Sequence, residues 1–301
     1  MSQLTLSLLD QLESEAIHIM REVAAEFERP VMMYSIGKDS SVMLHLALKA
    51  FTPGPIPFPL LHVDTRYKFP EMTDFRDRIA HKLGFDLRVH YSREKDDCSF
   101  NPWDLGTVRC CASLKTQALL HSITAGGYDA VIGGARREEE RSRAKERIFS
   151  FRDVHGQWEP RRQRPEFWSL YNSSLNQGES MRVFPLSNWT ELDIWRYIAQ
   201  ESIEVVPLYF AAEREVIERS GQLIPCGEGT QLLPREVPRR VLCRYRTLGC
   251  YPCTAAIGSS AVSVNDIILE LEQSRLSERT TRIIDHDQDG SMERKKREGY
   301  F

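Results

Sequence analysis

The sequence lacks several features that would place the protein in a special class. It has no apolar run of about 18 residues, which argues against a membrane span or a membrane partner. Residues 1–15 show no basic stretch followed by an apolar one, so we expect no secretory signal and a cytoplasmic protein. A formal net charge of -3 argues against broad electrostatic binding to nucleic acid, although a local basic groove is compatible with it. There is no internal repeat and no low-complexity segment.

Structural disulfides are not expected either. In a cytosolic chain, seven cysteines point to metal or redox chemistry more than to disulfides. Four of them form two tight pairs, Cys110 with Cys111 and Cys250 with Cys253. The cysteines without such a neighbour are interpreted as structural, namely Cys98, Cys226 and Cys243.

The sequence does contain a regular alternation of apolar strands and amphipathic helices. Short apolar stretches predict buried strands at 31–35, 60–65, 86–92 and 129–135. Helices are predicted at 5–28, 40–51, 70–84 and 113–127, and a further helix starts near Thr190, where Asp193 completes a capping box. Short links between such elements imply right-handed parallel crossovers. We therefore expect an α/β fold with a doubly wound, mostly parallel sheet and helices on both faces.

Two larger segments follow from this pattern. Residues 1–200 are expected to form the α/β domain, and residues 201–301 a less regular C-terminal extension that packs on it. Within the domain, 149–180 is interpreted as a long ordered insert, because a disordered linker would be poor in aromatic residues. This insert and the charged tail at 291–301 are candidate docking surfaces for a partner.

The stretch "SIGKDSS" at 35–41 lies between a predicted strand and a predicted helix. A Walker A loop would need a glycine five positions before Gly37, where Met32 stands. Backbone N–H groups at the helix start nevertheless favour an anion, and Lys38 adds a positive charge. Asp39 could cap the helix or hold Mg²⁺. The alternative is an ordinary turn with a surface lysine, but a loop between a buried strand and a helix favours a phosphate site.

A second polar stretch, "GGARREEERSR", follows the fourth predicted strand. Gly133 and Gly134 would allow the backbone to approach a ligand. Arg136 and Arg137, joined by Arg143, have the fork of donors that suits a phosphate or sulfate oxyanion. Glu138 to Glu140 are expected to balance the charges of these arginines. A solvated, salt-bridged helix face is expected for Lys145, Glu146 and Arg147.

The loop at 35–41 resembles the PP-loop of the N-type ATP pyrophosphatases, which usually reads Ser-Gly-Gly-Lys-Asp-Ser. Ile36 in place of the first glycine is a departure shared with the sulfate adenylyltransferase small subunits, which belong to the superfamily of the PAPS reductases. Four further stretches resemble that family: "PFPLLHVDT", "GGARREEERSRAKERIFSFRD", "RVFPLSNWTELDIW" and "VPLYFAAER". The tail "SMERKKREGYF" resembles it too.

The resemblance implies an adenine nucleotide alpha hydrolase-like fold and an enzyme that cleaves ATP·Mg²⁺ between its α- and β-phosphates. Sulfate would be the acceptor, and a GTPase large subunit in a heterodimer would drive the uphill formation of adenylylsulfate. The implied catalytic residues are Lys38, Arg136 and Arg137. The implied binding residues are Ser35, Gly37, Lys38, Asp39, Ser40, Ser41, Asp64, Gly133, Gly134 and Arg143. Asp64 would lie near the ribose or the adenine edge, or else it caps a turn.

The four paired cysteines depart from that family and resemble the [4Fe–4S] signature of bacterial adenylylsulfate reductases. The implied ligands are Cys110, Cys111, Cys250 and Cys253. Zinc or four reduced thiols are the alternatives. A reductase is disfavoured because the tail "REGYF" lacks the cysteine that such enzymes carry there.

A cluster would instead suit sulfur transfer, such as DNA phosphorothioate modification with a cysteine desulfurase and DNA as partners. The basic, aromatic segment 149–168 could then face a nucleic acid strand. Arg66 and Tyr67 stand where the small subunits usually have Gly-Trp, so the acceptor site could differ. A regulatory subunit that binds nucleotide without turnover is a third possibility.

Overall fold

The computed structural model describes residues 6–92, 101–139, 141–159, 161, 163–227 and 230–273. The expectations for Cys98, Glu140 and the tail at 291–301 lie outside these residues. No helix in the described ranges is both long and apolar enough to cross a membrane.

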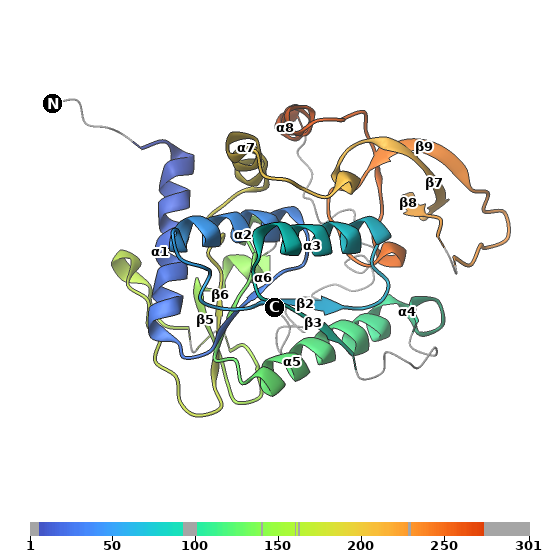
Figure 1. Cartoon of the computed structure of the whole chain (residues 1–301). Coiled ribbons are helices and arrows are strands. Elements are labelled where there is room, and N and C mark those ends of the chain that lie inside the picture. The colour runs from blue at the N-terminus through green and yellow to red at the C-terminus, as the bar shows by residue number, and fades with distance from the viewer. Residues whose placement is uncertain are drawn as a thin grey trace.

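A six-stranded sheet forms the centre of the molecule (Figure 1). Its strands are β1 (Pro30–Met33), β2 (Leu60–Asp64), β3 (Leu87–Tyr91), β4 (Ala130–Ile132), β5 (Phe149–Arg152) and β6 (Ser180–Val183). The strand order is β3-β2-β1-β4-β6-β5, and every neighbouring pair is parallel except β5 with β6. The predicted mostly parallel, doubly wound sheet is therefore confirmed. The stretch interpreted as an insert begins with a strand, β5, which pairs along the edge of β6.

Helices cover both faces of this sheet, as expected (Figure 1). On one face lie α1 (Leu8–Glu26), α2 (Lys38–Phe51), α3 (Pro70–Leu83) and α7 (Glu191–Glu201). On the other lies α5 (Ala118–Gly126), which continues from α4 (Pro102–Cys111) through a π-helical stretch (Ala112–Gln117). Successive strand residues point to opposite faces, so Met32 packs with the first group while Val31 packs against Leu119 of α5.

The C-terminal third is more regular than expected. A four-stranded antiparallel sheet, ordered β10-β9-β7-β8, follows α7. Its strands are β7 (Ala212–Arg219), β8 (Gln222–Pro225), β9 (Arg239–Arg244) and β10 (Ile257–Gly258). The final described helix, α8 (Val264–Gln273), packs near α7. The sequence did not predict this sheet, because β7 and β9 are largely exposed and carry too few apolar residues for a clear alternation.

Short elements complete the chain. They are η2 (Arg137–Glu139), α6 (Arg141–Ala144), η4 (Phe167–Ser169), η5 (Pro207–Tyr209) and η6 (Tyr251–Cys253). The predicted capping box at the start of α7 is confirmed. The Thr190 hydroxyl accepts a hydrogen bond from the backbone N–H of Asp193, and the Asp193 carboxylate accepts one from the backbone N–H of Thr190.

Candidate active site

The carboxyl ends of β1, β2 and β4 meet at one edge of the sheet. The strands are in parallel register, with Met33 opposite Leu61 and Met32 opposite Ile132. Loop 34–37, Asp64 and Gly133 therefore follow neighbouring strands along the same edge. The chain leaves β1 for β2 on one side and later returns to β4 on the other, and ligands of doubly wound sheets bind at such a switch point.

Loop 35–37 holds an unusual backbone conformation. Ile36 has a φ of 69°, in the left-handed region that disfavours β-branched residues. Its side chain is fully buried in the core against α2, and this burial offsets the strain. The resembling PP-loops have glycine at this position, which adopts such a φ without penalty. The loop thus keeps a glycine-like turn with a different residue.

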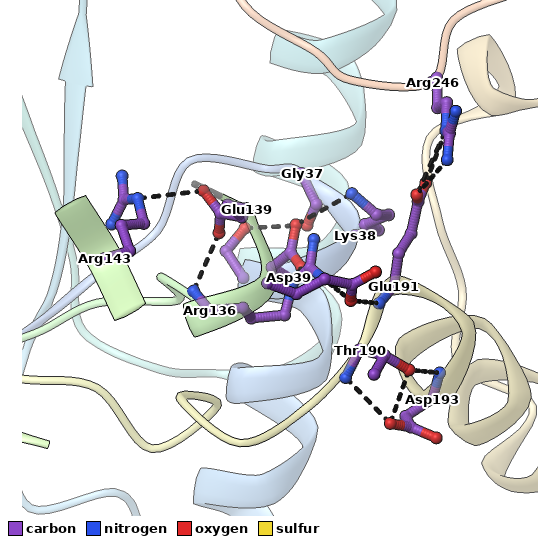
Figure 2. A network of polar contacts seen from close by, with 12 residues as sticks. Gly37, Lys38, Asp39, Arg136, Glu139, Arg143, Thr190, Glu191, Asp193 and Arg246 are labelled. Carbon is purple, nitrogen blue, oxygen red and sulfur yellow. Dashed lines mark hydrogen bonds and ion pairs between the residues drawn. The ribbon is translucent and has the colours of Figure 1, made fainter. Parts of the chain in front are cut away.

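Lys38 starts α2 and is not a surface lysine. Its side chain is 2% exposed, and its ammonium lies 3.2 Å from Oδ2 of Asp39. The other carboxylate oxygen of Asp39 accepts from Nε of Arg136 at 2.8 Å (Figure 2). Asp39 is not the helix cap, because Gly37 holds that position without a side-chain hydrogen bond. Two cations and one carboxylate therefore meet at the N-terminus of α2.

Arg136 fixes the loop after β4 to the start of α2. It is 1% exposed, its backbone N–H donates to Glu139 at 2.9 Å, and its guanidinium lies 3.4 Å from Glu138. The close approach depends on Gly134, because a Cβ there would lie 3.2 Å from the Cβ of Asp39. Glu138 and Glu139 balance the arginines, as expected.

The predicted hydroxyl donors divide into two groups. Ser40 donates to the carbonyl of Gly37 at 2.9 Å and lies 3.4 Å from the Ser35 hydroxyl, so both belong to the loop. Ser41 instead lines a separate cavity of 170 Å³ together with Tyr34. Its hydroxyl is buried and has no hydrogen-bond partner among the described residues. The structure does not bring Ser41 to the other loop hydroxyls.

The two further predicted arginines occupy different places. Arg137 donates to the side chain of Asn188, which also bonds Glu15 of α1, so its guanidinium is held on the α1 side. Arg143 is 8% exposed, and its Nε lies 3.1 Å from Glu139, which connects it to the Arg136 network (Figure 2). Arg136 is the predicted arginine that reaches loop 35–41, through its ion pair with Asp39.

The expectation for Glu146 was wrong. Instead of lying on a solvated helix face, Glu146 is 4% exposed and accepts from Nη2 of Arg152 at 2.6 Å. Arg152 is fully buried on β5, and this burial lowers the pKa of its guanidinium. The nearby charge of Glu146 acts in the opposite direction and raises that pKa. The pair ties the loop that carries Arg136 and Arg143 to the edge of the sheet.

Asp64 caps a turn at the end of β2. One carboxylate oxygen accepts from the backbone N–H of Arg66 at 2.8 Å, and the other lies 3.3 Å from Arg76. Arg66 has a φ of 65°, a left-handed conformation that glycine adopts more readily than arginine. Nearby His62 is neutral, because burial lowers its pKa to about 4 and Lys68 adds to the effect. A contact of Asp64 with the nucleoside stays a prediction.

The four paired cysteines come together, although 139 positions separate Cys111 from Cys250 in the sequence. Cys253 has a raised pKa because its thiol hydrogen-bonds Cys111, because it is buried, and because the other thiols lie close by. Burial, followed by the proximity of Cys111 and Cys250, raises the pKa of Cys110 to about 12. The Cys250 thiol also lies 3.0 Å from the hydroxyl of Thr65. Outside this quartet, Cys243 is buried in β9 and Cys226 is half-buried.

No single-metal site is formed by these thiols. In the described part of the chain, no group of three or more Cys, His, Asp or Glu side chains is arranged to hold one metal ion. Four thiolates on one zinc ion would have to lie about 4 Å apart, since each Zn–S bond is about 2.3 Å. Four thiols are a donor set that zinc and iron–sulfur clusters both use, so a metal centre at this quartet stays a prediction.

Comparisons with known proteins agree with the motifs. The family model "Phosphoadenosine phosphosulfate reductase domain" matches residues 29–256. Three curated relatives are named sulfate adenylyltransferase subunit 2. The one from Shewanella amazonensis is 60% identical over 100% of both chains. Those from Pseudoalteromonas translucida and Methylococcus capsulatus are each 59% identical, over 99% and 98% of this chain and 100% and 98% of their own length.

The chain belongs to the sulfate adenylyltransferase subunit 2 family. The resemblance drawn from the sequence motifs is confirmed, and members of this family are named as one subunit of an enzyme. The match runs through both sheets, so the antiparallel C-terminal sheet belongs to the family fold as well as the six-stranded sheet.

Tyr209 is a residue of the site that the sequence did not reveal in this member of the subunit 2 family. The hydroxyl of Tyr209 accepts from the backbone N–H of Lys38 at 2.8 Å. Tyr209 ends η5 and packs edge-on against Trp195 of α7, with ring centroids 5.3 Å apart. It therefore stands at the helix N-terminus, where an anion would bind. The stretch "VPLYFAAER" was noted for its family resemblance, and the available signal was the single hydroxyl group in its apolar part, on Tyr209.

Proposed function

We propose that this chain is the ATP-cleaving subunit of a sulfate adenylyltransferase, which converts ATP and sulfate to adenylylsulfate and pyrophosphate. The observation that carries the proposal is the identity of about 60% with relatives of that name over the full chain. The loop at 35–41 supports it, because a buried lysine and a helix N-terminus lie where a doubly wound sheet binds ligands.

The proposed chemistry is attack of a sulfate oxygen on the α-phosphorus of ATP, with pyrophosphate as the leaving group. Negative charge builds on the departing oxygen, and fixed positive groups lower the barrier. Lys38 and the first N–H groups of α2 would hold that charge. Arg136 keeps Asp39 and Lys38 in place, and Tyr209 would move from the Lys38 N–H when a phosphate oxygen binds there.

Mg²⁺ would share the phosphate charge. Asp39 is the only carboxylate in loop 35–41 and the residue there that can act as an anionic oxygen ligand. Its two oxygens contact Lys38 and Arg136, so it is already fixed at the helix start. When bound, the ion would neutralise charge on the phosphates.

Sulfate-dependent exchange of labelled pyrophosphate into ATP tests the proposal. The purified subunit is assayed with and without the large subunit, which we propose is a GTPase because formation of adenylylsulfate is uphill. Exchange that requires sulfate supports adenylyl transfer. Exchange that proceeds equally without sulfate, or binding of ATP without any exchange, contradicts it. Binding of ATP without exchange would favour a regulatory subunit that binds nucleotide without turnover.

The alternatives receive less support. The matching family model carries the name of a reductase domain, but the relatives with 57–61% identity are named as sulfate adenylyltransferase subunits. Nothing among these names favours DNA phosphorothioate modification, a cysteine desulfurase or a DNA partner. Sulfate activation is therefore the function that the geometry and the relatives support together.

We also propose that the cysteine quartet binds a [4Fe–4S] cluster. Its support is the meeting of four thiols, two from the end of α4 and two from η6 and the residue that caps it. When bound, such a cluster would supply a redox-active centre and a clamp between the two segments. Cys250 would then connect the cluster to the end of β2 through Thr65.

Replacing Cys250 with serine is expected to remove most of the bound iron. A serine hydroxyl is a weaker ligand for iron than a thiolate, and the loss of one of four ligands destabilises a cluster. Iron and acid-labile sulfide are measured in protein purified without oxygen, beside the visible spectrum. Cys226→Ser is the matched control, since Cys226 lies outside the quartet and should leave the iron content unchanged. Equal iron in both variants would remove Cys250 from the ligands, and iron-free wild-type protein would refute the cluster.

A further inference from the structure

A small cavity lies between α2, α3 and the chain that follows α7. Its volume is 170 Å³, and its lining comes from these three segments together with Tyr34, the residue that follows β1. The lining does not include Lys38, Asp39 or Arg136, which meet at the N-terminus of α2. The cavity is therefore separate from the candidate active site.

Two buried hydroxyl groups lie on the wall of this cavity. Tyr34 is 0% exposed and Ser41 is 5% exposed, and neither hydroxyl oxygen has a hydrogen-bond partner among the described residues. Burial raises the pKa of the Tyr34 hydroxyl, so this group stays protonated and can donate as well as accept. Buried polar groups of folded proteins are almost always hydrogen-bonded, so two such hydroxyls at one cavity indicate a bound molecule that completes their bonding.

Water alone fits this cavity poorly. At about 30 Å³ for each molecule, the cavity has room for about six waters, and each buried water needs about two to four polar partners. Most of the remaining lining is apolar and offers no such partners. It consists of Leu44, Leu48, Phe75, Ile79, Leu83 and Ile203. An apolar body is therefore the better match for most of the space.

The charged groups in the lining favour a neutral ligand. His45 lies 3.1 Å from Glu201, and Lys82 pairs with Glu204, which also pairs with Arg78. The four titratable side chains of the lining other than Tyr34 are thus matched with one another across the cavity rim. An ionic ligand would lose its hydration here without gaining an unmatched counter-charge from them.

We propose that the cavity binds a small neutral molecule with an apolar body and one hydroxyl head group. The head group donates to one of the two buried hydroxyls and accepts from the other. An apolar cavity of about 150 Å³ holds one benzene molecule, so a phenol or a short-chain alcohol has the right size. Since Tyr34 precedes loop 35–37 and Ser41 lies in the first turn of α2, the ligand connects both flanks of this loop. The site lies beyond the proposed function and does not depend on it.

Titration of the purified chain with phenol, followed by ligand-detected NMR, tests the proposal. Toluene is the matched ligand, because a methyl group replaces the hydroxyl at nearly the same size. The ratio of the affinities for phenol and toluene is expected to fall at least threefold in Tyr34→Phe and in Ser41→Ala. It should fall at least tenfold in the double variant, because phenol loses both hydrogen-bond partners while toluene loses none.

Tyr197→Phe is the matched control variant. The Tyr197 hydroxyl donates to Glu13 at 2.6 Å, and Tyr197 does not line the cavity. The affinity ratio should stay within twofold of the wild type in this variant. Thermal unfolding checks the fold of the other two variants. Tyr34→Phe and Ser41→Ala should keep or raise the melting temperature, because each removes a buried hydroxyl that has no partner in the described chain.

Three outcomes would overturn this ligand site. The first is no saturable binding of phenol to the wild type, which would mean that water alone fills the cavity. The second is an unchanged affinity ratio in the double variant. The third needs no variant: in the wild type, phenol should show nuclear Overhauser contacts to the methyl groups of Leu44 and Ile79, and contacts elsewhere alone would contradict the site. Pyrophosphate exchange is not part of this test, so its failure would leave the proposed function unaffected.

Discussion

Replacing Lys38 with alanine is expected to lower kcat of sulfate-dependent pyrophosphate exchange by about a hundred- to a thousandfold. The Lys38 side chain is 2% exposed and lies at the start of α2, where little water competes with its charge. A group that stabilises the departing pyrophosphate acts mainly in the transition state. The loss should therefore appear in kcat more than in the KM for ATP. Steady-state exchange kinetics at saturating ATP measures it.

Lys49 provides the matched control for this change. It lies on the same helix, but its ammonium pairs with Glu13 and Glu201, on the α1 and α7 side. Lys49→Ala should reduce stability slightly and leave kcat within about threefold of the wild type. Lys38→Met keeps more of the side-chain volume and should be as inactive as Lys38→Ala. Retained turnover in both Lys38 variants would show that the lysine has no role in charge stabilisation.

The central sheet could be predicted because its signals are local. A parallel strand buried on both faces has a short continuous apolar sequence, such as the one at 60–65. The helix after it is recognised by apolar residues spaced three and four positions apart. The short links then leave few topologies. The loop at 35–41 could be found for the same reason, since Gly37 and Lys38 adjoin each other at a strand-to-helix junction.

The partners of that loop could not be predicted from local signals. Tyr209 reaches Lys38 across 171 positions, and Arg136 reaches Asp39 across 97. Such contacts depend on how the sheet and α7 bring distant segments of the chain together. A single sequence does not reveal which distant segments become neighbours in space. For the same reason Ser41 was grouped with Ser40, although its position on α2 turns its hydroxyl toward a cavity beside Tyr34.

Burial of charge was the other feature that the sequence concealed. Glu146 lies in a run of charged residues, "RSRAKER", that is typical of a solvated helix. The helix α6 ends at Ala144, however, and the chain then turns Glu146 inward to meet Arg152. A buried arginine on β5 needs a carboxylate, and Glu146 supplies it from six positions earlier in the chain.

Replacing Glu146 with glutamine is expected to destabilise the protein by about 3–5 kcal/mol, because it leaves the fully buried Arg152 without its counter-charge. Glutamine has nearly the same shape, so packing changes little and the missing charge accounts for the loss. For a chain of this length, the melting temperature should fall by roughly 5–10 °C. Thermal unfolding followed by circular dichroism measures the change.

The pair of Glu218 and Arg239 allows a direct comparison with the buried pair. Its N–O distance is also 2.6 Å, but the two side chains are 58% and 56% exposed. Glu218→Gln should therefore cost less than about 1 kcal/mol, since water already screens both charges. Equal melting temperatures for Glu146→Gln and Glu218→Gln would show that burial does not set the strength of the Glu146–Arg152 pair. A large fall for Glu146→Gln alone would establish this pair as the anchor of the loop that carries Arg136 to the active site.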